Sequence, residues 1–169
     1  MARQTDSWFF PPFTAERMHD PLQRALVSVR AMTTNAGGIA VYARAHKAVL
    51  GRGWSFDIKE PAMTGAEMLL GSLAAEVLEL FLRLARQQRL TVDEMEASLQ
   101  AELKDPLVHL GVIGAEGEPR YSSFTVKVYA GSPAPADALR AVWEEAVRRA
   151  PLLNTLRRAA PVQLTFQQT

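Results

Sequence analysis

The sequence predicts an α+β protein in which antiparallel sheets wrap around one long central helix. Short β-like segments separated by glycine turns come first, and a long run of strong helix formers follows from Thr64 to about Leu90. Alternating apolar and polar residues, typical of strands, come after it. With 169 residues the chain is near the usual size of one domain. We therefore predict a single domain over residues 21–169.

Residues 1–20 are predicted to form an N-terminal arm. They mix charged residues, prolines and aromatic residues without a helical or strand period, so we expect the arm to be ordered only where it docks. The cluster of aromatic residues in the segment 8–13 indicates that it does dock on another surface.

The following segment is predicted to be an antiparallel meander. Its β-like runs are residues 26–29, 38–43 and 54–58, and turn signals separate them at residues 35–38 and 51–53. Pro61 ends this β-like part of the chain.

The longest predicted element is a helix over residues 65–89, which would be about 37 Å long at 1.5 Å per residue. Thr64 precedes it and Glu67 follows three residues later, the spacing of a capping box. The first four turns are apolar on most of their circumference, which predicts a buried helix. Small residues at positions 71, 72, 74 and 75 leave room for a second helix, which a second subunit could supply.

The remaining chain is predicted to contain two paired strands, two helices and a last strand. Residues 97–104 and 124–129 alternate with a two-residue period and are expected to pair through the segment 105–120. The helices are predicted over residues 136–149 and directly after Pro151, and the last strand over residues 162–166.

The composition excludes several classes of function. The chain contains no cysteine, so it has no disulfide, no thiolate metal ligand and no peroxidatic cysteine. The three histidines, His19, His46 and His109, lie in separate segments without metal-ligand spacing. We predict no metal site and no cofactor.

The charge and hydropathy patterns predict a cytoplasmic protein. The chain has 19 Lys and Arg against 18 Asp and Glu, and a net charge of +1 provides no long-range field for nucleic acid or an anionic membrane. Its longest apolar stretch, residues 68–82, is interrupted by Glu76 and Glu79 and is too short for a membrane span. The N-terminus does not resemble a signal peptide. We therefore expect neither a nucleic acid nor a membrane as partner.

The order of elements, together with three local segments, resembles the osmotically inducible protein C and organic hydroperoxide resistance family, the OsmC/Ohr proteins. The segments are residues 56–61, 64–76 and 150–156, within a match that spans roughly residues 25–165. The resemblance implies an OsmC-like α+β fold and an intertwined homodimer.

In that family the long helix carries a peroxidatic cysteine and the late segment begins with a second cysteine. The resemblance places these two positions at Glu76 and Ala150, and an assisting acidic position at Ala66. The peroxidase mechanism requires one thiolate to attack the O–O bond and a second thiol to resolve the sulfenic acid. The resemblance therefore implies the fold and the assembly, with no catalytic residues and no thiol peroxidase activity.

Two interpretations of Glu76 remain open in the sequence. In the first, Glu76 lies in the pocket that the family builds at its dimer interface, where a desolvated carboxylate could act as a general acid or base or anchor a ligand. In the second, Glu76 belongs to a polar stripe of the helix with a structural or solvated role. That stripe also contains an ion pair between Glu79 and Arg83.

The leading functional hypothesis is an OsmC-like protein that binds a small, partly apolar ligand in a dimer-interface pocket. Candidate lining residues are Met68, Ser72 and Glu76 on the helix, with Arg52 from the turn at residues 51–53. One alternative is a cysteine-independent enzyme that uses Glu76 as general acid or base. Another is a structural partner of a cysteine-bearing paralogue in a hydroperoxide or stress response.

Overall fold

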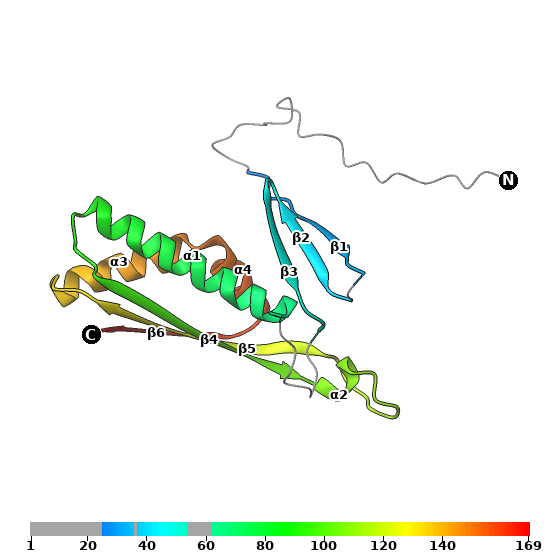
Figure 1. Cartoon of the computed structure of the whole chain (residues 1–169). Coiled ribbons are helices and arrows are strands. Elements are labelled where there is room, and N and C mark those ends of the chain that lie inside the picture. Colours follow the sequence, from blue (N-terminus) through cyan, green and yellow to red (C-terminus); the bar gives the residue numbers. More distant parts are fainter. Residues whose placement is uncertain (1–24, 36, 54–61) are drawn as a thin grey trace.

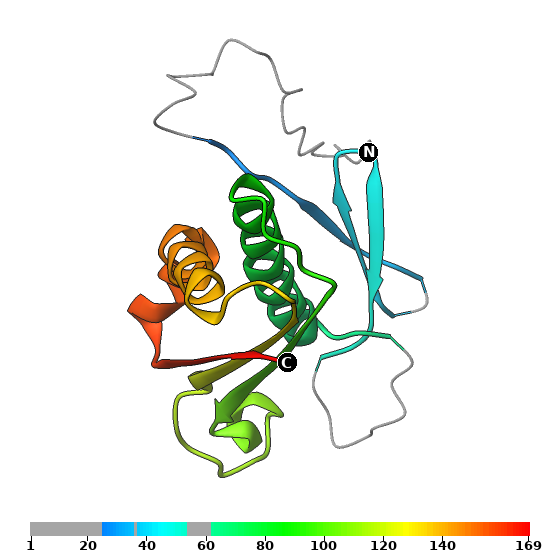
Figure 2. The same ribbon diagram turned by 90° about the vertical axis from the view of Figure 1, so that its left-hand side faces the viewer.

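A computed structural model describes residues 25–35, 37–53 and 62–169 of the chain. Its elements fall into two parts, a small N-terminal sheet and a larger body of one sheet covered by helices (Figure 1). The two sheets share no strand, and the small sheet stands apart from the body in both views (Figures 1 and 2). The N-terminal arm predicted over residues 1–20 lies outside the described residues.

The small sheet is an antiparallel meander of β1 (Arg30–Thr33), β2 (Ile39–Ala43) and β3 (His46–Leu50). The meander is confirmed. Of its predicted strands, the first is placed wrongly and the third lies outside the described residues. The first strand begins at Arg30, because Arg30 is the first residue that pairs with β2, and residues 26–29 precede it. The strand predicted at 54–58 falls on residues that the structure does not describe.

The third strand, β3, was not predicted. Its residues His46 and Lys47 are polar and exposed, so the segment shows no apolar alternation. It pairs with β2 because Arg44, with φ 54°, reverses the chain in a tight turn, and the ladder then runs from Ala43 opposite His46 to Ile39 opposite Leu50.

The long helix is confirmed as α1 (Gly65–Gln87). The Thr64 hydroxyl accepts a hydrogen bond from the Glu67 backbone N–H at 3.2 Å, and the Glu67 carboxylate accepts one from the Thr64 N–H at 2.7 Å. These two bonds form the predicted capping box. The bond that the carboxylate accepts from the Thr64 N–H is the main cause that lowers the pKa of Glu67. One face of α1 is buried, through Leu73, Val77, Leu80, Phe81, Leu84 and Ala85.

The body sheet contains β4 (Glu94–Lys104), β5 (Arg120–Gly131) and β6 (Val162–Gln168), in the order β4-β5-β6. The first pair is antiparallel as predicted, whereas β5 and β6 run parallel. A short helix, α2 (Pro106–His109), lies in the connection between β4 and β5. The parallel pairing arises because two helices, α3 and α4, carry the chain back before β6 begins.

The helices α3 (Ala136–Arg149) and α4 (Pro151–Ala159) pack beside α1 on one face of the body sheet (Figure 2). The main hydrophobic core lies between these helices and the sheet. At its centre Phe166 of β6 stacks on Trp143 of α3, with ring centroids 5.2 Å apart, and contacts Phe81 of α1 at 5.4 Å.

This arrangement confirms the predicted α+β class, with antiparallel sheets beside a long helix and one parallel strand added at an edge. The main core contains no residue of β1–β3. Among the described helices, none combines the length and the apolar character needed to cross a membrane.

Candidate functional site

Glu76 lies on α1 next to two fully buried residues of the core stripe, Leu73 and Val77, and its side chain is half-buried. The carboxylate reaches the first turn of α4. The Leu152 backbone N–H donates to both carboxylate oxygens at 3.0 Å, and the Leu153 N–H donates to Oε2 at 3.2 Å. Both oxygens of Glu76 are therefore engaged by the start of another helix.

The start of α4 needs such a partner because its own sequence supplies no cap. Ala150 occupies the N-cap position and Pro151 follows it, so no side chain of this segment accepts a hydrogen bond from the first turn. Leu152 and Leu153 would otherwise leave backbone N–H groups without an intrahelical acceptor. Glu76 accepts from both, and its negative charge lies at the positive end of the α4 dipole.

Ala150, the second position singled out by the family resemblance, lies two residues before Leu152 and is fully buried. The structure therefore brings the chain around Ala150 to the side chain of Glu76, across 76 positions of sequence. The third such position, Ala66, lies in the first turn of α1, far along the helix from Glu76.

The other predicted pocket residues divide into two groups. Met68 lies on α1 about two turns before Glu76 and Ser72 about one turn before it, and the Ser72 hydroxyl donates to the Met68 carbonyl at 2.8 Å. Arg52 is exposed and follows β3, where the Gly51 N–H donates to the Met63 carbonyl at 2.9 Å and ties the strand end to the start of α1. No hydrogen bond joins Arg52 to Met68, Ser72 or Glu76 within the described chain.

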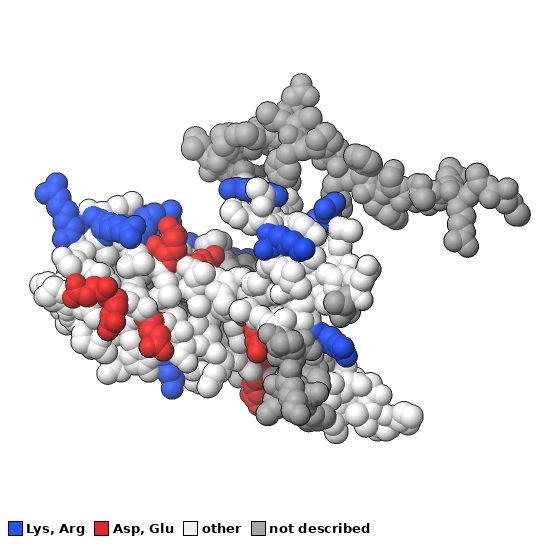
Figure 3. All heavy atoms as spheres, in the orientation of Figure 1, with Lys and Arg blue, Asp and Glu red and all other residues white. Residues whose placement is uncertain are grey.

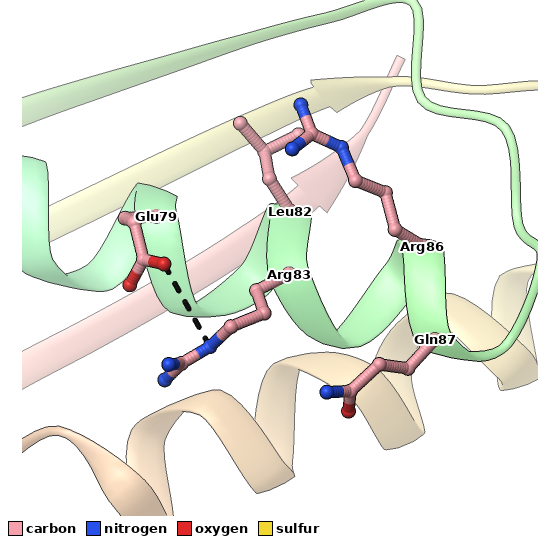
Figure 4. Close-up of a pocket in the computed structure, with 5 residues that line it drawn as sticks. All are labelled: Glu79, Leu82, Arg83, Arg86 and Gln87. Atoms are coloured by element: carbon pink, nitrogen blue, oxygen red, sulfur yellow. Dashed lines mark ion pairs between the residues drawn. The ribbon is translucent and has the colours of Figure 1, made fainter.

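An open groove lies further along the same helix, toward its C-terminal end. It is lined by Glu79, Leu82, Arg83, Arg86 and Gln87, all from α1 (Figure 4). Arg83 Nε lies 3.7 Å from Glu79 Oε1, which confirms the ion pair predicted on this face. Figure 4 shows Leu82 and Arg86 side by side, so the groove presents an apolar side chain next to a guanidinium.

The Arg148 and Arg149 side chains at the end of α3 both bind Glu145. Arg148 Nε and Nη2 donate to the Glu145 carboxylate at 2.6 and 2.5 Å, and Arg149 Nε also contacts it. The hydrogen bonds from Arg148 lower the pKa of Glu145 to about 2. The charge of these arginines is thus partly neutralised within their own helix.

Sequence reasoning did not find the backbone partners of Glu76. A signal for them does exist, since a helix that begins with Ala150 and Pro151 lacks the Ser, Thr, Asp or Asn that usually caps such a start. An uncapped helix start implies an acceptor from elsewhere in the fold, but the sequence does not say which side chain provides it.

Comparison with known proteins agrees with this architecture. The family model for OsmC-like protein matches residues 58–165. The fold is similar to an OsmC-like protein from Mycoplasma pneumoniae, with a TM-score of 0.70 and 13% identity over 86% of this chain and 98% of that chain. No curated protein matches the chain.

Two further solved structures with the same fold come from organic hydroperoxide resistance proteins. OsmC of Legionella pneumophila has a TM-score of 0.61 and 13% identity, over 85% of this chain and 99% of that chain. OhrB of Bacillus subtilis has a TM-score of 0.60 and 15% identity, over 84% of this chain and 98% of that chain.

The fold and the site therefore define a cysteine-free α+β protein in which a glutamate of the long helix caps a second helix. The chain belongs to the OsmC-like protein family, since the family model covers well over half of its residues.

We predict that Glu76 stabilises the fold as a helix cap. Glu76→Ala should lower the free energy of unfolding by about 1–2 kcal/mol, because two backbone N–H groups lose their acceptor. Glu76→Gln should cost about 1 kcal/mol, since the amide retains one acceptor and loses the charge at the helix dipole. Urea denaturation of each variant measures these differences.

Glu79→Gln is the matched control, because Glu79 lies on the same helix and its ion pair with Arg83 is exposed. It should change the free energy of unfolding by no more than about 0.5 kcal/mol. Equal effects of Glu76→Gln and Glu79→Gln would contradict the cap.

Proposed function

We propose that this chain is a cytoplasmic, dimeric OsmC-like protein without thiol peroxidase activity, which binds a small, partly apolar ligand along the outer face of α1. The proposal rests on the structural role of Glu76, whose carboxylate caps the start of α4. At the position where the family resemblance expects the reactive sulfur, this chain has a carboxylate engaged by two backbone N–H groups.

The absence of thiol chemistry follows from the residues themselves. Reduction of a hydroperoxide by the family mechanism requires a sulfur that accepts oxygen and a second sulfur that forms the disulfide. The chain has no cysteine, and a carboxylate and a methyl group cannot perform either step.

The use of Glu76 as a general acid or base is not favoured by the geometry. Both carboxylate oxygens accept hydrogen bonds from the start of α4, so moving the side chain toward a substrate would leave two helix N–H groups without an acceptor. A ligand beside Glu76 would contact a side chain that is already held in place.

Dimerisation is supported by a sheet face that the described chain covers only in part. One face of the small sheet consists of uncharged residues, mostly small or apolar, including Ala31, Val41 and Ala48 in one cross-strand row. A three-stranded sheet needs an apolar face packed on another element to be stable. The main core of the described chain does not include this sheet, and a second subunit could supply its cover.

The ligand surface is supported by the composition of the outer face of α1. Met68 and Ser72 lie before Glu76, and Leu82 and Arg86 line the groove after it. Apolar side chains with a few polar groups are typical of small-molecule sites. The groove is open in the single chain, and a partner subunit placed on α1 would enclose it.

We predict that the protein is a dimer in solution. The expected result from light scattering at micromolar concentration is about twice the chain mass, because an interface that covers both the small sheet and α1 would be of obligate size. A stable species with the mass of one chain, 18.6 kDa, would contradict the assembly.

We also predict that the protein does not accelerate the reduction of tert-butyl hydroperoxide by dithiothreitol. The rate should equal that of the reagents alone, since no thiolate is present to attack the O–O bond. The double variant Glu76→Cys with Ala150→Cys tests whether these positions correspond to the family pair, and gain of activity would support it. Turnover by the unaltered protein in a metal-free preparation would overturn the proposal.

The ligand surface can be tested with 8-anilinonaphthalene-1-sulfonate, a probe with apolar rings and one negative charge. Leu82→Glu should weaken binding at this surface at least tenfold, because it places a charge on the apolar part of the groove and opposes the sulfonate (1.4 kcal/mol corresponds to tenfold). Ile113→Glu, on a fully exposed side chain remote in sequence, is the control. Identical titrations of both variants and the parent would remove the groove as a site.

A further inference from the structure

The small sheet has a second face, which carries both charge and exposed apolar groups. Because side chains alternate across a strand, the row Arg30, Tyr42 and Lys47 lies on the side opposite to Val41. Arg30 and Lys47 both approach the Tyr42 ring, at 5.1 and 5.8 Å from its centroid. The next row on this face contains Met32 and Val49, which are 50% and 53% exposed.

This part of the chain also concentrates the exposed apolar side chains. Nine large hydrophobic residues are exposed among those described, and five of them lie between positions 26 and 49: Leu26, Val27, Val29, Met32 and Val49. Exposed apolar patches on a protein surface often mark a binding site, and Met32 and Val49 lie in one row of the sheet. The exposed apolar side chains Met32 and Val49 make this second face a candidate docking surface.

The charge of the face restricts what that occupant can be. Residues 25–53 contain Arg30, Arg44, Lys47 and Arg52 and not a single Asp or Glu. In the view of Figure 3 the coloured side chains over β1–β3 are accordingly Lys and Arg. An occupant that suits this face combines apolar or aromatic groups with some negative charge, because guanidinium and ammonium groups attract both aromatic rings and carboxylates.

The first 24 residues of the chain supply aromatic groups and are continuous with β1 through residues 25–29. They contain four aromatic residues within six positions, Trp8, Phe9, Phe10 and Phe13. Their three acidic residues, Asp6, Glu16 and Asp20, are balanced by three arginines, so the aromatic rings and not the net charge suit the cations of the face. From Phe13 to Ala25 the chain has twelve residues, which can span up to about 40 Å. The third strand of a sheet lies only about 10 Å from the first, so this length is sufficient to reach Val49 from β1.

We propose that this second face of the small sheet, bearing Arg30, Tyr42, Lys47, Met32 and Val49, is the docking surface for the aromatic segment 8–13 of the same chain. The aromatic rings cover Met32 and Val49 and stack near the two cations. Covalent attachment favours this occupant over a separate molecule, because the segment is always present at high effective concentration.

The test uses the full-length protein labelled at the methionine methyl groups. Aromatic rings that lie on the face shift the Met32 methyl signal through their ring currents, and the triple variant Trp8→Ser, Phe9→Ser and Phe10→Ser should abolish this shift. Met32→Leu assigns the signal. The Met95 methyl group, which packs against the main core, is the internal control and should not move. An identical Met32 signal in the parent and the triple variant would overturn the proposal.

Trypsin cleavage after Arg17 and Arg24 provides a second measurement that does not alter the arm. Met32→Glu with Val49→Glu should raise the cleavage rate about tenfold relative to the parent, because docking protects the segment in proportion to its bound population. Ile113→Glu should leave the rate unchanged. If instead the Leu82 methyl signals, observed in a second sample labelled at the leucine methyl groups, respond to the triple variant while Met32 does not, the arm occupies the groove on α1 and the assignment to the small sheet is wrong.

Discussion

The fold depends on the burial of one face of α1 against the body sheet and α3. Leu73, Val77 and Phe81 are completely buried, and each side chain of this kind contributes about 1.5–3 kcal/mol relative to an exposed one. The stripe continues into Phe166 and Trp143, whose rings join the last strand to α3. Rotating α1 about its axis would expose this stripe, so the packing determines which residues face α4 and which face outward.

That constraint explains how the fold accommodates a charged residue at position 76. Its neighbours Leu73 and Val77 are buried, so position 76 lies at the edge of the core, within reach of the first turn of α4. A polar side chain at such a position must find hydrogen-bond partners. Helix α4 begins with two N–H groups that lack a local acceptor, and the two requirements satisfy each other. Glu76 therefore has a structural role, because it connects α1 to the start of α4.

The sequence predicted the elements whose signals are local. The Thr64 and Glu67 capping box, the two-residue period of β4 and β5, and the Pro151 start of α4 each depend on residues a few positions apart, and the structure confirms them. The prediction failed where pairing is non-local. Strand β3 has no apolar alternation and exists because β2 lies beside it, and residues 26–29 are apolar but have no strand to pair with in the described chain.

In the candidate site, too, contacts between residues near in sequence were predictable and contacts between distant residues were not. The ion pair of Glu79 and Arg83 was predictable from a spacing of four residues, whereas the bonds of Glu76 connect positions 76 residues apart. Side-chain type alone left Glu76 open to a catalytic, a ligand-binding or a structural role. The distinction depends on which groups surround the carboxylate, and this is set by how α4 packs on α1.

The overall composition of the chain does not reveal the local positive charge of the small sheet. A net charge of +1 suggests an even mixture of acidic and basic residues, yet residues 25–53 carry four cations and no acidic residue.

The two faces of this sheet therefore suit different covering groups. The uncharged face resembles half of a core, which a second subunit can complete by packing alone. The face with Arg30 and Lys47 cannot be buried in a core without partners for its charges, so it favours a polar and aromatic cover at the surface. The main core contains no residue of this sheet, so the body of the protein is packed around α1 without it.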